Sequence, residues 1–338
     1  MRKLATIQKI AEILPIDGAD SIERVRIKEW WCVAKKGEFK IGDSCVYFEI
    51  DSLLPSSNSV FQFLAKGNKE RTMTVEGKEY KGFRLKTIKL RGALSQGLAL
   101  PIKNDSWDFS GYAIDDEVSD IIGVVKYEPP IPAEMSGKMK GFFPAFIPKT
   151  DEERIQNMGE VLNGFYVTEK LDGASVTYFK KDGVFGVCSR NLELLESEGN
   201  TQWRLAREMG LLEKLPDNFA LQGELIGEGI QKNPLKIKGQ KVYFYNAYNI
   251  LSGLYLDFLN FKQLLATLGL ESVPVLDENF TLPNNVRGML EYAEGKSALC
   301  PDAEREGVVV RPKTEMKYKG VRFSFKAISN KYLLAEES

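Results

Sequence analysis

The stretch Phe165–Gly173, FYVTEKLDG, places a lysine, a carboxylate and a glycine at the end of an apolar segment. Its aromatic and β-branched residues predict a strand over Phe165–Glu169. Lys170 then stands where partial loss of solvent and nearby positive charge lower the pKa of a lysine, so that neutral amine becomes available as a nucleophile. Asp172 could anchor a hydrated metal ion, and Gly173 allows a tight turn and the close approach of a ligand. The same pattern also fits an exposed strand-end lysine in a turn, so the stretch alone does not decide between the two.

Composition limits the chemistry that can accompany this lysine. The chain has 338 residues, which indicates about two domains, and its 43% hydrophobic and 28% charged residues are typical of a folded protein. Histidine is absent, which excludes Ser-His-Asp and Cys-His catalysis, histidine-ligated zinc and imidazole acid/base chemistry. Lys and Arg number 46 and Asp and Glu 47, so the net charge is −1 and any nucleic acid must be held by local basic patches.

Cysteine usage and hydropathy predict the compartment. Cys32, Cys45, Cys188 and Cys300 form no CxxC pair, and we expect them to be reduced and buried. No apolar run approaches the roughly 20 residues that span a bilayer, and residues 1–15 lack the apolar core of a signal peptide. We therefore expect a soluble protein of a reducing intracellular compartment, cytoplasmic or nuclear, with no membrane partner.

Composition also divides the chain into three parts. Residues 1–123 are dense in short strand-like segments and predict a compact barrel, with a five-stranded nucleic-acid-binding barrel as one candidate. Residues 124–149 hold five of the 14 prolines and are interpreted as a linker. Residues 150–338 predict an α+β domain with mainly antiparallel sheets. The helices expected there are Asp151–Leu162, Thr201–Leu215, Asp257–Leu268 and Asn330–Glu336, and the strands include Ala174–Lys180, Val184–Arg190, Ala220–Ile226, Val242–Ile250, Gly307–Arg311 and Val321–Ile328.

More residues suited to nucleotide chemistry follow this lysine in the sequence. Arg190 ends the next hairpin, Glu224 stands at a strand end before a glycine-rich segment, and the aromatic strand Tyr243–Ile250 reads YFYNAYNI. Glu306 precedes a buried strand, and Arg311–Lys331 holds seven basic residues and one acid. Each alone has an ordinary explanation, as a solvated carboxylate, a core aromatic residue or a solvated basic face. Their order along the chain is what gives them weight.

In this order the segments resemble the signature motifs of the covalent nucleotidyltransferase superfamily, which comprises polynucleotide ligases and mRNA capping enzymes. The matching positions are Lys170–Gly173, Arg190, Glu224, Tyr248–Ile250, Glu306–Gly307 and Lys326. Within the superfamily, the segment Gly223–Asn233, GELIGEGIQKN, resembles ATP-dependent RNA ligases of the second phage T4 type. Gly42–Pro55 and Arg91–Pro101 resemble relatives that carry an amino-terminal OB barrel, so the resemblance covers essentially the whole chain.

The resemblance implies an ATP-dependent RNA ligase built from an OB-type barrel and a nucleotidyltransferase domain. In that family a lysine attacks the α-phosphorus of ATP and expels pyrophosphate, the AMP passes to the 5′-phosphate of an RNA, and a 3′-hydroxyl displaces AMP to seal the strand. The implied substrate is RNA with 3′-hydroxyl and 5′-phosphate ends, including duplex nicks. The implied cofactors are ATP and Mg²⁺ or Mn²⁺, and the implied state is a monomer.

The resemblance also implies roles for single residues. Lys170, Lys326 and Glu306 are the expected catalytic residues, with Lys326 on the α-phosphate. Asp172, Glu224 and Glu306 are expected to hold the metal ion through its waters, although Glu224 could instead bind a ribose hydroxyl. Tyr248 is expected to stack on adenine, and Arg190 to reach a ribose hydroxyl or a phosphate. The backbones of Glu169 and Leu171 are expected to flank the base. The full set expected to contact the nucleotide is Glu169, Leu171, Arg190, Glu224, Phe244, Tyr248 and Lys326.

Two basic features complete the expected site. Many relatives have two lysines separated by one residue in the last motif, whereas Ser324 and Ile328 flank Lys326 here, so Arg322 or Lys331 would have to supply the second cation. The segment Lys78–Arg91 holds six basic residues and one acid. It is interpreted as a patch for RNA or for the triphosphate tail of ATP, and a solvated strand face fits the same residues equally well.

Three alternatives fit parts of the sequence. A capping guanylyltransferase or a DNA ligase shares the motifs and differs in using GTP or nicked DNA. A non-catalytic nucleic-acid-binding protein would keep the barrel beside a decayed second domain, and the intact lysine and carboxylates argue against it. A Schiff-base lysine enzyme would also use an activated lysine, but nothing else in the sequence supports it.

Overall fold

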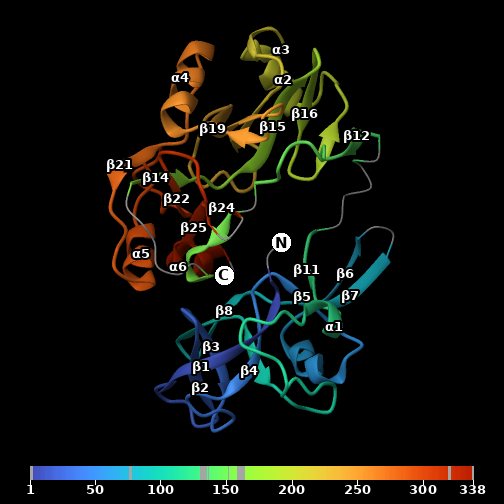
Figure 1. Ribbon diagram of the computed structural model, residues 1–338, viewed down its shortest axis with the longest axis vertical. Coiled ribbons are helices and arrows are strands. Elements are labelled where there is room, and N and C mark those ends of the chain that lie inside the picture. The colour runs from blue at the N-terminus through green and yellow to red at the C-terminus, as the bar shows by residue number, and fades with distance from the viewer. Residues whose placement is uncertain are drawn as a thin grey trace. The chain divides into compact units, whose positions relative to one another are not determined.

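Figure 1 shows the computed structural model, in which residues 3–75, 78–129, 135, 137–150, 152–157, 164–318 and 321–336 are described. The chain forms two compact units, Met1–Ile131 together with Leu334–Ser338, and Pro132–Leu333. Among the described residues, no helix is both long enough and apolar enough to cross a membrane.

Short strands in antiparallel sheets make up the first unit. One sheet has the order β10-β4-β1-β2-β3, another β11-β5-β7-β6, and β8 forms a ribbon with β9. The strands are β1 (Ala5–Pro15), β2 (Ile22–Ile27), β3 (Trp30–Lys35), β4 (Ser44–Phe48), β5 (Ser52–Pro55), β6 (Glu70–Val75), β7 (Lys78–Arg84), β8 (Thr87–Leu90), β9 (Ala93–Gln96), β10 (Leu98–Pro101) and β11 (Val125–Lys126). The helical segments are the 3-10 helix η1 (Ser59–Lys66) and α1 (Ser119–Ile122).

Strand β1 joins both halves of the first sheet. It pairs with β4 through Ala5–Lys9 and with β2 through Ile10–Pro15, and the register shifts between Ile10 and Glu12. A bulge of this kind bends a strand and increases its twist. The sheet therefore curls, as closure into a barrel requires.

Two larger sheets make up the second unit. The order of the seven-stranded antiparallel sheet is β12-β17-β16-β15-β18-β19-β20, and that of the other is β13-β25-β22-β14-β21, in which β13 pairs parallel to β25. The strands are β12 (Met139–Phe142), β13 (Glu153–Arg154), β14 (Phe165–Lys170), β15 (Ala174–Lys181), β16 (Val184–Cys188), β17 (Leu192–Leu194), β18 (Phe219–Gly227), β19 (Gln240–Asn249), β20 (Leu254–Tyr255), β21 (Val275–Phe280), β22 (Gly307–Pro312), β23 (Lys317–Tyr318), β24 (Val321–Arg322) and β25 (Phe325–Ile328). The helices are η3 (Ile155–Asn157), α2 (Thr201–Glu208), α3 (Leu211–Lys214), α4 (Phe258–Leu268), α5 (Val286–Ala293) and α6 (Asn330–Glu336).

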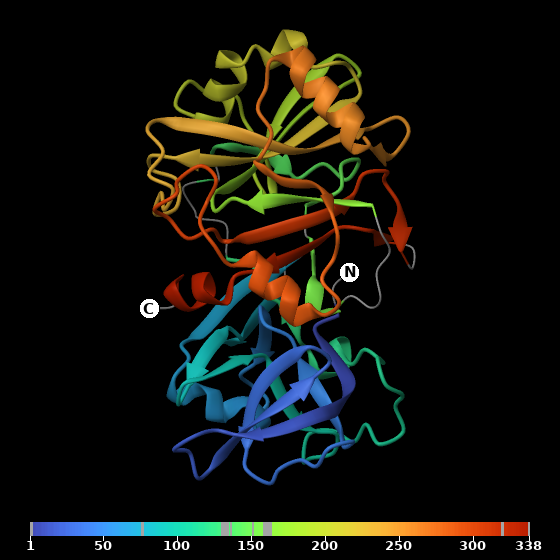
Figure 2. The same ribbon diagram turned by 90° about the vertical axis from the view of Figure 1, so that its left-hand side faces the viewer.

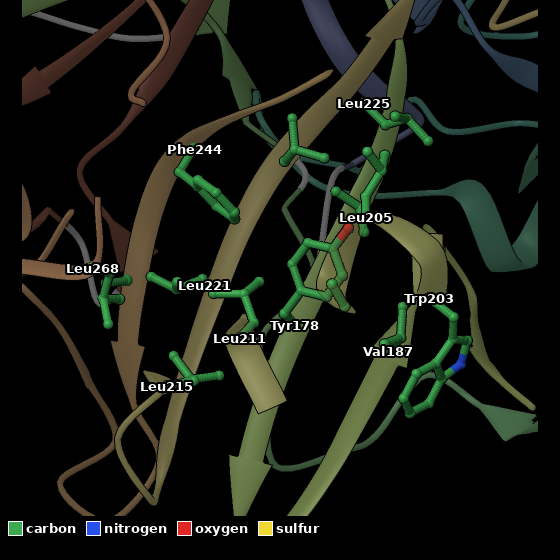
Figure 3. Close-up of a cluster of buried hydrophobic side chains, with 14 of the residues drawn as sticks. Tyr178, Val187, Trp203, Leu205, Leu211, Leu215, Leu221, Leu225, Phe244 and Leu268 are labelled. Carbon is green, nitrogen blue, oxygen red and sulfur yellow. The ribbon is translucent and has the colours of Figure 1, made fainter. Parts of the chain in front are cut away.

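Helices cover one face of each sheet in this unit (Figure 2). Trp203 of α2, Leu211 of α3 and Leu268 of α4 pack in one apolar cluster with Tyr178 and Leu221 of the seven-stranded sheet (Figure 3). Helix α5 packs in the same way on the five-stranded sheet. Because successive residues of a strand point to opposite faces, each sheet keeps a second face for other side chains.

The expected α+β class with mainly antiparallel sheets is confirmed. The helix expected over Thr201–Leu215 is instead two helices, because Gly210 takes a left-handed conformation (φ 67°) between α2 and α3. Residues 124–149, interpreted as a linker, contain β11 and β12, which pair with β5 and β17. The strand expected over Val321–Ile328 is divided into β24 and β25.

The helix expected over Asp151–Leu162 falls largely on residues that are not described. Residue 151 and residues 158–162 lie outside the described residues, and Glu153–Asn157 form a two-residue strand and a 3-10 helix. Parallel pairing of β13 with β25 replaces helical bonds in that part.

Replacing Leu221 by alanine tests the helix-covered core. Leu221 is fully buried, so we expect Leu221→Ala to lower the free energy of unfolding by about 2–5 kcal/mol, because the smaller side chain packs less and leaves a cavity. The control is Leu251→Ala, since Leu251 is 76% exposed and its replacement should cost less than about 0.5 kcal/mol. Urea unfolding followed by circular dichroism measures both, and equal costs would contradict the assigned core.

Candidate active site

Lys170 and Glu306 meet because the end of one strand lies beside the start of another. Lys170 is the last residue of β14 and stands opposite Gly307, the first residue of β22. Glu306 directly precedes β22, and its Oε1 lies 2.6 Å from the Lys170 Nζ. A Cβ at Gly307 would lie 2.2 Å from the carbonyl oxygen of Ala327 in β25. The glycine therefore lets β22 approach β25 closely at the point where the carboxylate is held.

The seven-stranded sheet contributes Glu224 to the same cluster. Glu224 lies in β18, and burial raises its pKa, to about 8. The charge of Lys170 acts to lower this pKa, whereas the charges of Glu306 and Asp172 raise it. Arg190, which follows β16, also acts to lower it. The fold thus brings five of the expected site residues within electrostatic reach of one another.

The pKa of Lys170 is raised rather than lowered. Burial acts to lower it, but the negative charges of Glu306, Glu224 and Asp172 outweigh burial and leave the pKa above its ordinary value. The expectation of a lowered pKa is therefore wrong for the protein residues by themselves. A divalent cation at these carboxylates would neutralise the charges that hold the proton on Nζ.

Hydrogen bonds and close packing fix both the end of β14 and the loop that follows it. Glu169 accepts a hydrogen bond through Oε2 from the amide of Ala298 at 2.7 Å. The carbonyl oxygen of Gly173 accepts one from Nε2 of Gln231 at 3.2 Å. A Cβ at Gly173 would lie 2.4 Å from the carbonyl oxygen of Leu225, so only glycine fits this close approach to β18.

The two residues inside this loop differ in their surroundings, since one packs in an apolar cluster and the other makes a polar contact. Leu171 is buried and packs with Ile226 and Val273. Asp172 is half-buried, and its Oδ2 accepts a hydrogen bond at 2.6 Å from the hydroxyl of Tyr332 in α6. Sequence reasoning missed Tyr332, because a single tyrosine in a short helix belongs to none of the motifs.

Lys326 lies on the same face of the five-stranded sheet as Lys170. It stands opposite Val309, and alternation along β22 and β14 places both lysines on the face that α5 does not cover. The residues expected to supply a second cation are engaged elsewhere. Arg322 donates to Asn246 at 3.1 Å, and the Lys331 Nζ lies 2.9 Å from a carboxylate oxygen of Glu294, the residue that follows α5.

The two expected adenine contacts lie on opposite faces of the seven-stranded sheet. Phe244 is fully buried in the cluster beneath the helices, so the structure does not bring it to the carboxylates. Tyr248 lies on the other face, the face of Glu224, in a cluster with Phe179, and its ring centroid is 5.0 Å from that of Tyr255. Its partner in β18 is four residues from Glu224 along the strand, about 13 Å.

A bulge in β19 adds a further aromatic residue near the carboxylate of Glu224. The register of β18 and β19 shifts between Gln222 and Gly223, which makes Tyr245 the extra residue. Its hydroxyl donates to Oγ1 of Thr150 at 3.2 Å. Burial raises its pKa, and the charge of Glu224 raises it further. The alternation of aromatic residues in the sequence gave no sign of this bulge.

One buried and one half-buried ion pair lie where the two sheets face each other. Arg311 of β22 is 2% exposed, donates from Nη2 to Oε1 of Glu152 at 2.6 Å, and lies 5.7 Å from the ring of Tyr245 in β19. Arg322 donates from Nε to Oε2 of Glu315 at 2.8 Å. Burial by itself raises the pKa of Glu152, but the charges of Arg311 and Arg322 outweigh it and hold the pKa at about 2. The Glu152–Arg311 pair therefore stays charged inside the unit.

The donors around Lys170 fit a hydrated divalent cation. Asp172, Glu224 and Glu306 supply hard oxygen atoms, and Mg²⁺ binds such groups while keeping several waters. Burial is the main cause of the raised pKa of Glu224, and the neighbouring charges of Glu306 and Asp172 add to it, so a cation at this point would favour the ionised form of the carboxyl group. In the described part of the chain, no group of three or more Cys, Asp or Glu side chains is placed to ligate an ion directly.

Comparisons with known proteins agree with this arrangement. Residues 4–102 match an OB-fold domain family, and residues 163–328 match the RNA ligase family. Comparison with curated protein sequences gives no match. An OB-fold unit followed by a lysine–carboxylate site in a two-sheet domain defines a covalent nucleotidyltransferase. The chain belongs to the RNA ligase family, and the predicted RNA ligase with an amino-terminal OB domain is confirmed.

Solved structures of Naegleria gruberi RNA ligase are similar to the whole chain. A variant of that ligase with AMP and Mn is 42% identical over 100% of this chain and 99% of that chain, with a TM-score of 0.84. Another variant, with ATP and Mn, is 41% identical over 99% of each chain, with a TM-score of 0.83. The ligase with pyrophosphate is 42% identical over 98% of each chain, with a TM-score of 0.82.

Acid titration tests the Glu152–Arg311 pair. The pKa of Glu152 is about 2 in the folded chain against an ordinary 4.5, so its contribution to stability is complete above pH 4.5 and is lost as the pH falls toward 2. We expect the difference in unfolding free energy between the parent protein and Glu152→Gln to be largest above about pH 5 and to shrink below it. Denaturant unfolding at several pH values measures it, and a difference that does not change with pH would contradict the pairing.

Proposed function

We propose that this RNA ligase seals 3′-hydroxyl and 5′-phosphate RNA ends, including duplex nicks, through AMP carried on Lys170. The observation that supports this most directly is the half-buried amine of Lys170, whose Nζ lies 2.6 Å from Glu306 and which also feels the charges of Glu224 and Asp172. ATP is the nucleotide donor. The chemistry needs no histidine, in agreement with the composition.

The reaction has three steps, and each step forms one bond to phosphorus and breaks another. The Lys170 Nζ loses a proton and attacks the α-phosphorus of ATP, and the bond from that phosphorus to the pyrophosphate oxygen breaks. A 5′-phosphate oxygen of an RNA then attacks the α-phosphorus of the AMP and breaks its bond to Nζ, which takes up a proton. The 3′-hydroxyl of the other strand gives its proton to solvent and attacks the phosphorus of that 5′-phosphate, and the bond from this phosphorus to AMP breaks. Each transfer places negative charge on phosphate oxygens, so catalysis depends mostly on positioned cations.

The surrounding residues take the remaining roles in this proposal. Lys326, on the same sheet face as Lys170, contacts the α-phosphate. Arg190 reaches a ribose hydroxyl or a phosphate, and Glu224 binds a ribose hydroxyl or a metal-bound water. Tyr248 stacks on adenine, because a nucleotide is long enough to extend along the strand from the carboxylates to this ring. The backbones of Glu169 and Leu171 flank the base.

Mg²⁺ or Mn²⁺ completes the site. Asp172, Glu224 and Glu306 hold it through its waters. The bound ion offsets charge on the phosphates and on the carboxylates. Glu306 thus serves both as the ion-pair partner of Lys170 and as a metal anchor.

The remaining proposals concern the organisation of the chain. We place an OB-fold domain at 1–123, a linker at 124–149 and the nucleotidyltransferase domain at 150–338, and we propose a monomer. The four cysteines are free thiols in the structure, three of them buried, which supports a reducing cytoplasmic or nuclear compartment.

The basic segment of the first unit is proposed to bind the RNA backbone. From Tyr80 to Asn104 the sequence holds basic residues and no acidic one. Lys89 and Arg91 are exposed in the β8–β9 ribbon, beside the 43% exposed Ile88. Aromatic residues are absent from this ribbon, so phosphate contact is favoured over base stacking.

Label transfer from α-labelled ATP tests the nucleophile. We expect Lys170→Ala and Lys170→Arg to abolish covalent labelling, because arginine keeps the charge but has no neutral amine at ordinary pH. The control is Lys181→Ala, since Lys181 pairs with Asp182 in an exposed turn, and it should label like the parent. Parallel incubations with labelled GTP and NAD show which nucleotide donates the covalent label. Labelling of either Lys170 variant would remove Lys170 from the role.

Salt dependence of nick binding tests the basic ribbon. Replacing Lys89 and Arg91 together by alanine should lower the slope of log affinity against log salt by about 2, because each phosphate that the ribbon no longer neutralises reduces the slope by about one. Covalent labelling by ATP should stay unchanged. The matched control is Lys35 and Lys36 replaced by alanine, which removes two charges elsewhere on the first unit. Abolished labelling with unchanged RNA binding would assign the ribbon to the triphosphate instead.

A further inference from the structure

Helix α6 is joined to the site at its first turn. It follows β25, the strand of Lys326, after one residue. Both elements are labelled in Figure 1. That residue, Ser329, is 1% exposed and donates from its amide to the carbonyl oxygen of Glu306 at 2.9 Å. Its side-chain oxygen accepts a hydrogen bond from the amide of Tyr332 at 3.2 Å. The start of α6 is therefore fixed relative to the residue that pairs with Lys170.

This anchoring brings the Tyr332 hydroxyl to Asp172. The hydroxyl lies 2.6 Å from Asp172 Oδ2, a distance typical of a strong hydrogen bond to a charged acceptor. A carboxylate bonded through one oxygen has the direction of its second oxygen set as well. The charge of Asp172 also acts on Lys170 and on Glu224, so its orientation affects the whole cluster.

We propose that Tyr332 is a positioning residue for nucleotidyl transfer, whose hydroxyl orients the Asp172 carboxylate toward the waters of the divalent cation. The inference rests on the proposed function, since it requires a cation at these carboxylates. Outer partners of this kind set the direction of metal-binding groups, and their removal commonly costs tenfold or more in metal affinity or activity. The proposal extends the site to a helix that follows the last recognised motif.

The test uses Tyr332→Phe in the full-length chain, because phenylalanine keeps the ring and removes the hydroxyl alone. Mn²⁺ binding is measured by electron paramagnetic resonance on the ATP complex of Lys170→Ala, which forms no covalent adenylate. We expect Tyr332→Phe to raise the Mn²⁺ dissociation constant about tenfold. In the otherwise unsubstituted enzyme it should raise the Mn²⁺ concentration for half-maximal labelling by a similar factor, with the KM for ATP changed less than about twofold.

A double-mutant cycle ties the effect to the contact. In an Asp172→Ala background, Tyr332→Phe should change the Mn²⁺ dissociation constant no further, because the acceptor is already gone. The matched control is Tyr292→Phe, a tyrosine whose ring packs on Phe280 in the apolar cluster of α5, and it should behave like the parent.

Three outcomes would overturn the proposal. They are an unchanged Mn²⁺ affinity in Tyr332→Phe, an equal weakening with and without Asp172, and a faster labelling rate, which would make the contact an inhibitory one. Failure of the proposed function would give a different result, because the unsubstituted enzyme would then take no label from ATP.

Discussion

The site depends on the pairing of β14 with β22, which brings the lysine at the end of one strand to the carboxylate at the start of the other. That pairing holds Lys170 and Glu306 2.6 Å apart. The facing sheet adds Glu224, and together the three carboxylates raise the pKa of the lysine despite burial. A divalent cation at these carboxylates would offset the negative charge that surrounds the amine. The position of the amine and the charge around it thus both depend on the pairing of these two strands.

The parts of the site that are local in sequence could be predicted, because each lies in or beside a strand that the sequence signals. Lys170, Asp172, Glu224 and Glu306 are of this kind, and the structure brings them together. Phe244 shows the limit of the same reasoning. It belongs to the expected aromatic strand, but the register of β18 and β19 puts it on the helix-covered face.

The parts that could not be predicted depend on register and on distant contacts. The bulge that places Tyr245 near Glu224 arises from the pairing of two strands, and no residue pattern in either strand signals it. Tyr332 reaches Asp172 because Ser329 fixes the start of α6. Gly210 has a local signal, since glycine often ends a helix, but the amphipathic pattern continues across it and predicted a single helix.

The order of the five-stranded sheet has a consequence for biosynthesis. β14 lies near the middle of the chain, whereas its partner β22 and the next strand, β25, lie near the carboxyl end. Contacts between distant segments form late, and a chain emerges from the ribosome amino end first. In a growing chain, Lys170 is therefore synthesised well before Glu306, the acidic residue that pairs with it. The lysine–carboxylate pair can assemble only after β22 has left the ribosome and paired with β14.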